Sequence, residues 1–196
     1  MLRRALLTTL SLALLAAPTL GQALLELKPA LGITFTNVSR EPVGGSANGQ
    51  VGYQLGGSAL IGERLYLEGG LFLAKKSVEF TSTTTTTLNI QTGLTGLRIP
   101  VMVGYHLLGH PSEFLSLRVF GGGSLFMVTN VNAPGLTKAD FTSPTYGLFA
   151  GVGLDLMMFF ADLQYEWSLS DYSDLAALDV GQSRSLYLNA GVKIVF

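Results

Sequence analysis

The sequence predicts an all-β protein whose strands close into an eight-stranded, antiparallel, up-and-down barrel. Three observations predict it: the mean hydropathy is high at +0.43, apolar residues alternate with polar or small ones, and short and long connections follow each other in turn. Beyond the N-terminal segment, no apolar run reaches the roughly 18 residues that a membrane helix needs. High hydropathy without such a run is typical of strands with one apolar face.

The N-terminal segment has the pattern of a cleaved secretory signal peptide. Two arginines precede an apolar stretch at 5–17, and small residues follow it up to Ala23. A membrane-anchoring helix is the alternative, but the stretch is short for a bilayer and ends at Pro18. We therefore expect residues 1–23 to be the signal peptide and residues 24–196 to form one barrel domain.

Eight segments show the two-residue period of a half-buried strand. Most have close to the ~9–11 residues of a tilted membrane strand. The segments are 25–36, 50–61, 65–74, 97–106, 115–127, 145–156, 160–170 and 185–196. The fourth is expected to begin near Leu88, with a β-bulge where the alternation slips around Thr95–Gly96.

The connections between these segments alternate in length. The short ones are 62–64, 107–113 and 157–158, and the long ones are about 37–49, 76–87, 129–143 and 171–183. A meander with its short turns at one end and its long loops at the other is typical of bacterial outer-membrane barrels. A signal peptide and an even number of strands would place both termini in the periplasm. We therefore expect the outer membrane of a Gram-negative-type bacterium.

Glycines and aromatic residues indicate which face of the strands meets lipid. A soluble, lipocalin-like barrel would expose its polar face to water and favour Thr, Lys or Glu there over glycine. The polar face here is rich in glycine, which suits the crowded interior of a narrow, membrane-embedded barrel. The apolar face carries aromatic residues near both ends of the strands. This placement is expected for two girdles of aromatic residues, one at each bilayer interface. These residues are Phe35, Tyr105, Tyr146, Phe159, Tyr165, Trp167 and Phe196.

The chain ends on Phe196, and Ile194, Val192 and Ala190 precede it at two-residue spacing. This pattern resembles the terminal strand that the barrel-assembly machinery recognises in outer-membrane barrels. We expect Phe196 to be both an interface anchor and part of that assembly signal.

Strand parity directs a nearly balanced set of charges into the interior, as a poorly solvated space requires. The set is Glu26, Lys28, Glu68, Arg98, Arg118, Asp155, Asp162, Glu166 and Lys193. A tight turn at 157–158 would place Asp155 opposite Asp162, with Arg118 beside the first and Lys193 beside the second. We expect this ladder of base, acid, acid and base to stabilise the barrel, with a displacement of one residue pair if barrel shear shifts the strands.

Composition and motifs argue against several functions. The net charge of −1 gives no reason to expect nucleic-acid binding, and the lack of cysteine removes disulfides and thiolate metal sites. No phosphate-binding loop, zinc-protease motif or calcium loop occurs. The histidines, His106 and His110, fall at the short-turn end, away from the rim where a lipid A deacylase or an omptin-like protease would need them. We expect no catalytic residue, cofactor or metal.

The whole mature chain resembles the small eight-stranded outer-membrane barrels, in particular the PorT-like outer membrane protein beta-barrel group. Four stretches carry the resemblance: LRIPVMVGYHLL (97–108), AGVGLDL (150–156), LQYEWSLSD (163–171) and LNAGVKIVF (188–196). The resemblance implies an integral outer-membrane protein. Some members of the group serve secretion and others adhesion, and no catalytic motif is common to them.

We expect a non-enzymatic structural or interaction role through the extracellular loops, in adhesion, envelope integrity or secretion. The expected partners are outer-membrane lipid and lipopolysaccharide, the barrel-assembly machinery and an unidentified protein at the long loops. A lipid-modifying enzyme is one alternative and a narrow pore is another. A wide pore is not expected, because eight strands leave room only for side chains.

Closed outer-membrane barrels often stay folded in cold SDS. We predict that the protein fractionates with the outer membrane and migrates differently on SDS gels before and after boiling. Recovery as a soluble periplasmic protein that binds apolar ligands would instead support the lipocalin-like barrel.

Overall fold

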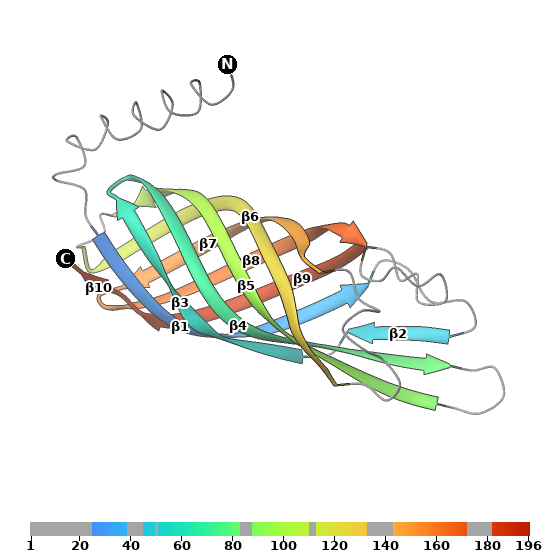
Figure 1. The fold of residues 1–196 in the computed structure, drawn as a ribbon. Coiled ribbons are helices and arrows are strands. Elements are labelled where there is room, and N and C mark those ends of the chain that lie inside the picture. Colours follow the sequence, from blue (N-terminus) through green and yellow to red (C-terminus); the bar gives the residue numbers. More distant parts are fainter. Residues whose placement is uncertain are drawn as a thin grey trace, which may run out of the picture.

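The computed structural model describes residues 25–38, 45–49, 51–82, 88–109, 113–132, 143–171 and 182–196. These residues form strands and turns (Figure 1). The strands are β1 (Leu25–Val38), β2 (Gly45–Gly49), β3 (Val51–Gly62), β4 (Leu65–Ser82), β5 (Leu88–Leu108), β6 (Leu115–Asn132), β7 (Thr145–Leu156), β8 (Phe159–Asp171), β9 (Gln182–Val192) and β10 (Ile194–Val195).

One antiparallel sheet contains all ten strands and closes on itself. The order is β10-β1-β3-β4-β5-β6-β7-β8-β9, and β1 also pairs with β9, which joins the two ends. β9 and β10 lie end to end, and both pair with the same side of β1. In the same way, β2 and β3 lie end to end along one side of β4. The ten strands therefore occupy eight positions around a barrel, and the predicted fold class is confirmed.

β5 begins at Leu88, as predicted. Two other strands run several residues further than predicted: β4 continues to Ser82 and β6 ends at Asn132, so much of the predicted 76–87 loop is strand. β2 lies inside the predicted 37–49 loop. These boundaries were wrong because they were drawn from membrane-like alternation. A strand beyond the membrane needs only a neighbour to pair with.

The predicted bulge at Thr95–Gly96 is confirmed. Thr95 pairs with Asn130, whereas Gly96 pairs with Val128, so β6 holds one additional residue at this point. The slip in alternation therefore reflects a shift in the register between β5 and β6. A second shift follows at the other end of β5, between His106 and Leu108.

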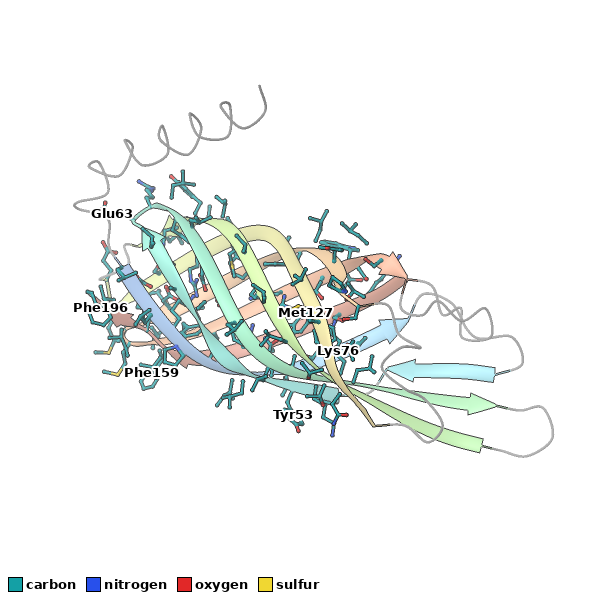
Figure 2. All side chains as sticks on the ribbon, viewed as in Figure 1. Tyr53, Glu63, Lys76, Met127, Phe159 and Phe196 are labelled. Atoms are coloured by element: carbon teal, nitrogen blue, oxygen red, sulfur yellow. The ribbon has the colours of Figure 1, made fainter. Side chains whose placement is uncertain are left out.

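Side chains alternate between a packed interior and an exposed apolar exterior (Figure 2). On β7 the inward Phe149 is 3% exposed, whereas the outward Leu148 is 52% exposed. Glycines on the inner face make room for the inward rings: a Cβ at Gly104 would collide with the ring of Tyr66, and one at Gly151 with that of Phe120. Glycine on this face is thus a packing requirement of a narrow barrel.

Two adjacent glycines of β6 provide a matched test of this requirement. An inward Cβ at Gly122 would collide with the backbone of Val101 and Met102, whereas an outward Cβ at Gly123 has its nearest neighbour 3.7 Å away. We predict that Gly122→Ala lowers the free energy of unfolding by about 1–3 kcal/mol, a usual effect of overpacking. Gly123→Ala should leave it within ~0.5 kcal/mol. Urea unfolding in detergent micelles would measure both, and equal losses would show that the inner face is not tightly packed.

Candidate functional site

A group of seven charged side chains fills the end of the barrel nearest the short turns. We call it the turn-end cluster, and it comprises Glu26, Lys28, Glu68, Arg118, Asp155, Asp162 and Lys193. All seven are at most 5% exposed. They come from β1, β4, β6, β7 and β8 and from the residue between β9 and β10.

Arg118 is the centre of the turn-end cluster. Its Nε donates to Asp155 Oδ1 at 3.0 Å and its Nη2 to Asp162 Oδ1 at 2.7 Å. Its Nη1 lies 3.4 Å from Glu68 Oε2 on β4, two strand positions away. One guanidinium therefore joins three carboxylates on three strands, which its planar, five-donor geometry permits.

The lysines connect the same carboxylates from other directions. Lys28 Nζ lies 3.2 Å from Glu68 Oε2 and 3.6 Å from Asp162 Oδ2. Lys193 Nζ lies 3.5 Å from Asp155 Oδ2. Each carboxylate that Arg118 contacts is thus also contacted by a lysine.

The predicted ladder is wrong in its order. Asp155 pairs with Phe160, and Asp162 pairs with Gly153, so the two acids are offset by two residues. The tight turn sets Leu156 opposite Phe159, which fixes this register. Arg118 contacts both acids, and Lys193 contacts Asp155 rather than Asp162.

A second charged group, the loop-end cluster, comprises Lys76, Arg98 and Glu166. Glu166 accepts from Arg98 Nη2 at 2.8 Å and lies 3.5 Å from Lys76 Nζ. Ser124 Oγ and Tyr187 Oη also donate to its carboxylate, at 2.7 and 3.1 Å. The Arg98 guanidinium stacks 4.1 Å from the centre of the Tyr187 ring. Arg98 and Glu166 lie on β5 and β8, so this contact crosses the barrel.

Lys76 was missed by the sequence analysis because the strand was ended at Ala74. The signal was present, since Lys76 continues the inward parity of Phe72 and Ala74. With Lys76 included, the interior holds as many bases as acids. The five acids Glu26, Glu68, Asp155, Asp162 and Glu166 now face the five bases Lys28, Lys76, Arg98, Arg118 and Lys193.

Aromatic and other apolar side chains occupy the space between and around the charges. Met102, Phe120 and Phe149 form one buried group, and Phe72 and Phe160 pack with Ala30 in another. Lys28 Nζ lies 4.4 Å from the centre of the Phe160 ring, a cation–π contact. The interior is therefore packed with side chains, as expected for eight strands.

His106 forms a buried pair that the sequence analysis did not predict. Its Nδ1 lies 2.7 Å from Ser116 Oγ, and its ring is 5.1 Å from that of Tyr66. All three residues are at most 2% exposed and lie inside the barrel. His110 lies outside the described residues. Among the described residues, no group of three or more His, Cys, Asp or Glu side chains could hold a metal.

All seven predicted interface aromatics point outwards, with exposed fractions between 36% and 70%. Phe159 and Phe196 lie together at the turn end (Figure 2), where the Phe196 amide donates to the Leu25 carbonyl at 2.8 Å. Tyr165 and Trp167 pack edge to face at 4.8 Å between ring centres. Among the residues whose exposure the structure describes, the predicted set omitted two further exposed aromatics, Tyr53 and Phe114. Anchoring by the whole set stays a prediction.

The closed sheet, apolar exterior and charged interior define a transmembrane β-barrel of the outer-membrane type. The sequence profile described as "Outer membrane protein beta-barrel domain" matches residues 19–174, and the chain belongs to this family. No curated protein matches the sequence. Among the described residues, no helix is long and apolar enough to cross a membrane.

Solved structures similar to the chain include the following three. The outer membrane protein OprG of Pseudomonas aeruginosa has a TM-score of 0.55 and 12% identity, covering 89% of this chain and 95% of its own. The N-terminal barrel of OprF from the same organism has a TM-score of 0.44, 15% identity and coverages of 86% and 97%. Ail of Yersinia pestis, solved with the heparin analogue sucrose octasulfate, has a TM-score of 0.48, 12% identity and coverages of 87% and 99%. At these identities, the likeness to OprG shows the fold alone. Membership of this family places the protein in the outer membrane of a Gram-negative-type bacterium.

The turn-end cluster predicts a large cost for losing its central base. Arg118→Met should lower the free energy of unfolding by on the order of 3–5 kcal/mol, because buried carboxylates lose a partner. Adding Asp155→Asn removes one of those charges and should recover part of the loss. Urea unfolding from detergent or lipid would measure both. The control is Arg64→Met at an exposed turn, which should cost less than ~1 kcal/mol. A double variant no more stable than Arg118→Met would contradict this account.

Proposed function

We propose that the protein is a non-enzymatic outer-membrane component that contacts a partner through a sheet projecting from the loop end of the barrel. This projecting sheet comprises 45–49, 76–82, 88–95 and 128–132. Figure 1 shows β4 and β5 running beyond the other strands, beside β2. A role in adhesion, envelope integrity or secretion would use this surface, and the PorT-like resemblance of the sequence supports the same range of tasks.

The observation that carries the proposal is the length of the paired strands. β4 has 18 residues and β5 has 21, whereas a membrane strand needs only about 9–11. The two stay in register from Leu65↔Tyr105 to Ser82↔Leu88. By contrast, the β7–β8 register ends at Gly147↔Ser168. The additional pairs have no role in spanning lipid.

Pairing also makes the projecting sheet suitable for binding. β2 pairs with Val78–Ser82 on one side of β4, and β6 pairs with Gly93–Gly96 on the far side of β5. Backbone ladders hold these strands in place before any partner arrives. A pre-ordered surface loses less conformational entropy on binding than a flexible loop does.

The interior supports a non-enzymatic role. Four of the five interior carboxylates, those of Glu68, Asp155, Asp162 and Glu166, form ion pairs with bases. The His106–Ser116 pair is enclosed. Release of acyl chains from labelled lipopolysaccharide, abolished by His106→Ala, would support the lipid-modifying alternative instead. The same packing is unfavourable for a narrow pore. Lipid and lipopolysaccharide remain the proposed surroundings, and the barrel-assembly machinery remains the proposed reader of the C-terminal strand.

A trimmed variant tests the proposal. Ser77 pairs with Gly93, so residues 78–92 can be replaced by Asn-Gly, the preferred two-residue hairpin turn. The barrel should still assemble and keep its heat-modifiable migration. Crosslinking in intact cells followed by mass spectrometry should lose the protein adducts of the wild type. The control is Glu63→Ala at an exposed short turn, which should keep them. Equal adduct yields from the trimmed variant would refute a role of the projecting sheet.

A further inference from the structure

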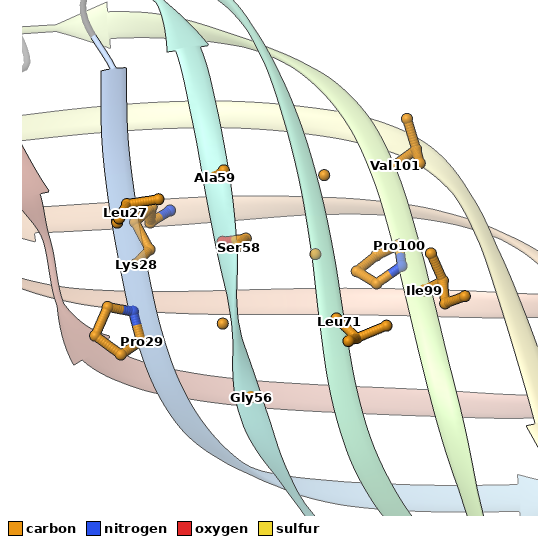
Figure 3. Close-up of a pocket in the computed structure, with 13 residues that line it drawn as sticks. Leu27, Lys28, Pro29, Gly56, Ser58, Ala59, Leu71, Ile99, Pro100 and Val101 are labelled. Carbon is orange, nitrogen blue, oxygen red and sulfur yellow. The ribbon is translucent and has the colours of Figure 1, made fainter.

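The wall of the barrel is hollowed on its outer side where β1, β3, β4 and β5 lie next to one another. The groove has a volume of about 540 Å³, within the range of small-molecule sites. Its floor consists of outward-facing Gly57, Ala59 and Gly69. Figure 3 shows Leu27 and Pro29 on one side of this floor, and Ile99 and Val101 on the other.

We propose that this groove binds a hydrocarbon chain, namely one acyl chain of a membrane lipid, and holds it against the barrel wall. The proposal does not depend on any partner at the projecting sheet. It concerns a particular place on a surface that is otherwise covered by large apolar side chains, such as Leu31, Leu55 and Leu73 on the same strands.

Strand pairing is interrupted at two places beside the groove: between β1 and the β9–β10 line, while the β1–β3 ladder stays continuous, and between β4 and β5. Along β1, pairs occur at Leu27↔Ile194 and Ala30↔Gly191, with none at the two described residues between them. Along β4, pairs occur at Gly69↔Val101 and Phe72↔Arg98, again with none at the two described residues between.

A proline lies at each interruption. Pro29 is in the gap on β1, and Pro100 is in the gap on β5, where it lacks the amide hydrogen that a ladder uses. Lys28, Ser58 and Pro100, which belong to the inward-facing set, also line the groove. The groove therefore reaches into the thickness of the wall, where a flat sheet would present only its outer side chains.

The height of the groove decides the medium that fills it. Gly69 lies four residues after Leu65, the start of β4, and Val101 lies four residues before Tyr105. With a rise of ~3.3 Å per residue and a strand tilt of about 40°, the groove lies roughly 10 Å above the turn end of the barrel. This height is inside the apolar band of a membrane barrel. The surroundings there are acyl chains. A void against them loses dispersion contacts, which a seated chain restores.

The chemistry and width of the groove favour a chain over a headgroup or a helix. Lys28 Nζ is 3.2 Å from Glu68, and Ser58 Oγ also donates to Glu68. Both groups are already engaged, so no charge recruits a headgroup. The floor spans β3 and β4 alone, roughly 5 Å between strand axes, whereas a helix with side chains is about 10–12 Å across.

Gly69 provides a test that leaves the backbone undisturbed. A Cβ added at Gly69 meets nothing within 4 Å, so Gly69→Leu should fill the groove without a clash. The control is Gly121→Leu, an outward position on β6 whose added Cβ has its nearest neighbour at 3.4 Å and which does not line the groove. Heat-modifiable migration would show that both variants are folded.

The probe is a phosphatidylethanolamine with a diazirine in the middle of one acyl chain, mixed into proteoliposomes that contain the full-length barrel. After photolysis, adducts are mapped by mass spectrometry. We expect adducts at Leu71 and Val101 to exceed those at Leu148 on β7 by about fivefold, which corresponds to about 1 kcal/mol. The excess should disappear in Gly69→Leu and persist in Gly121→Leu.

Two outcomes would overturn the proposal. Equal labelling of Leu71 and Leu148, or an excess unchanged in Gly69→Leu, would show that the groove holds no chain. The chain has no cysteine, so Leu71→Cys introduces a single thiol. Efficient disulfide formation between two such barrels in the membrane would identify a second copy of the chain as the occupant.

Discussion

The rest of the structure depends on one constraint: hydrocarbon offers no hydrogen-bond partner to a backbone amide or carbonyl. A sheet in a membrane must therefore have no edge. Here β1 pairs with β3 on one side and with β9 and β10 on the other, so that every strand position has two neighbours. Closure at eight positions leaves an interior only wide enough for side chains, and the exterior must be apolar.

The narrow interior explains both its glycines and its charge pairing. Inward rings such as Tyr66 and Phe120 fit only because Gly104 and Gly151 carry no side chain. Charges in such a space must be compensated locally, since little water reaches them. Arg118 meets this requirement by joining carboxylates from three strands, and Glu166 does so by accepting from Arg98 and lying close to Lys76. The contacts cross the barrel as well as linking neighbours, so they brace opposite walls.

The constraint ends where the membrane ends. Beyond the bilayer, β2, β4, β5 and β6 continue as an open sheet, which water permits because it can satisfy an unpaired edge. Within the bilayer, two interrupted ladders that contain Pro29 and Pro100 lie beside a groove with a floor of small residues. The first feature is the surface that we propose contacts a protein partner. The second is a place where the wall departs from a smooth apolar cylinder, and we propose that it holds an acyl chain.

The sequence by itself determined the number of strand positions, the face of each strand that turns inwards, the aromatic residues at the two ends and the nine charges first assigned to the interior. These features follow from a two-residue period, which is local. Tertiary structure alone decided which charges meet. The register of β7 against β8 offsets Asp155 from Asp162, and barrel closure brings Arg98 to Glu166 from a strand that is not its neighbour. It also decided that β4 and β6 continue past their predicted ends, because pairing outside the membrane leaves no hydropathy signal. The groove arises from four strands lying next to one another, and no single segment encodes that.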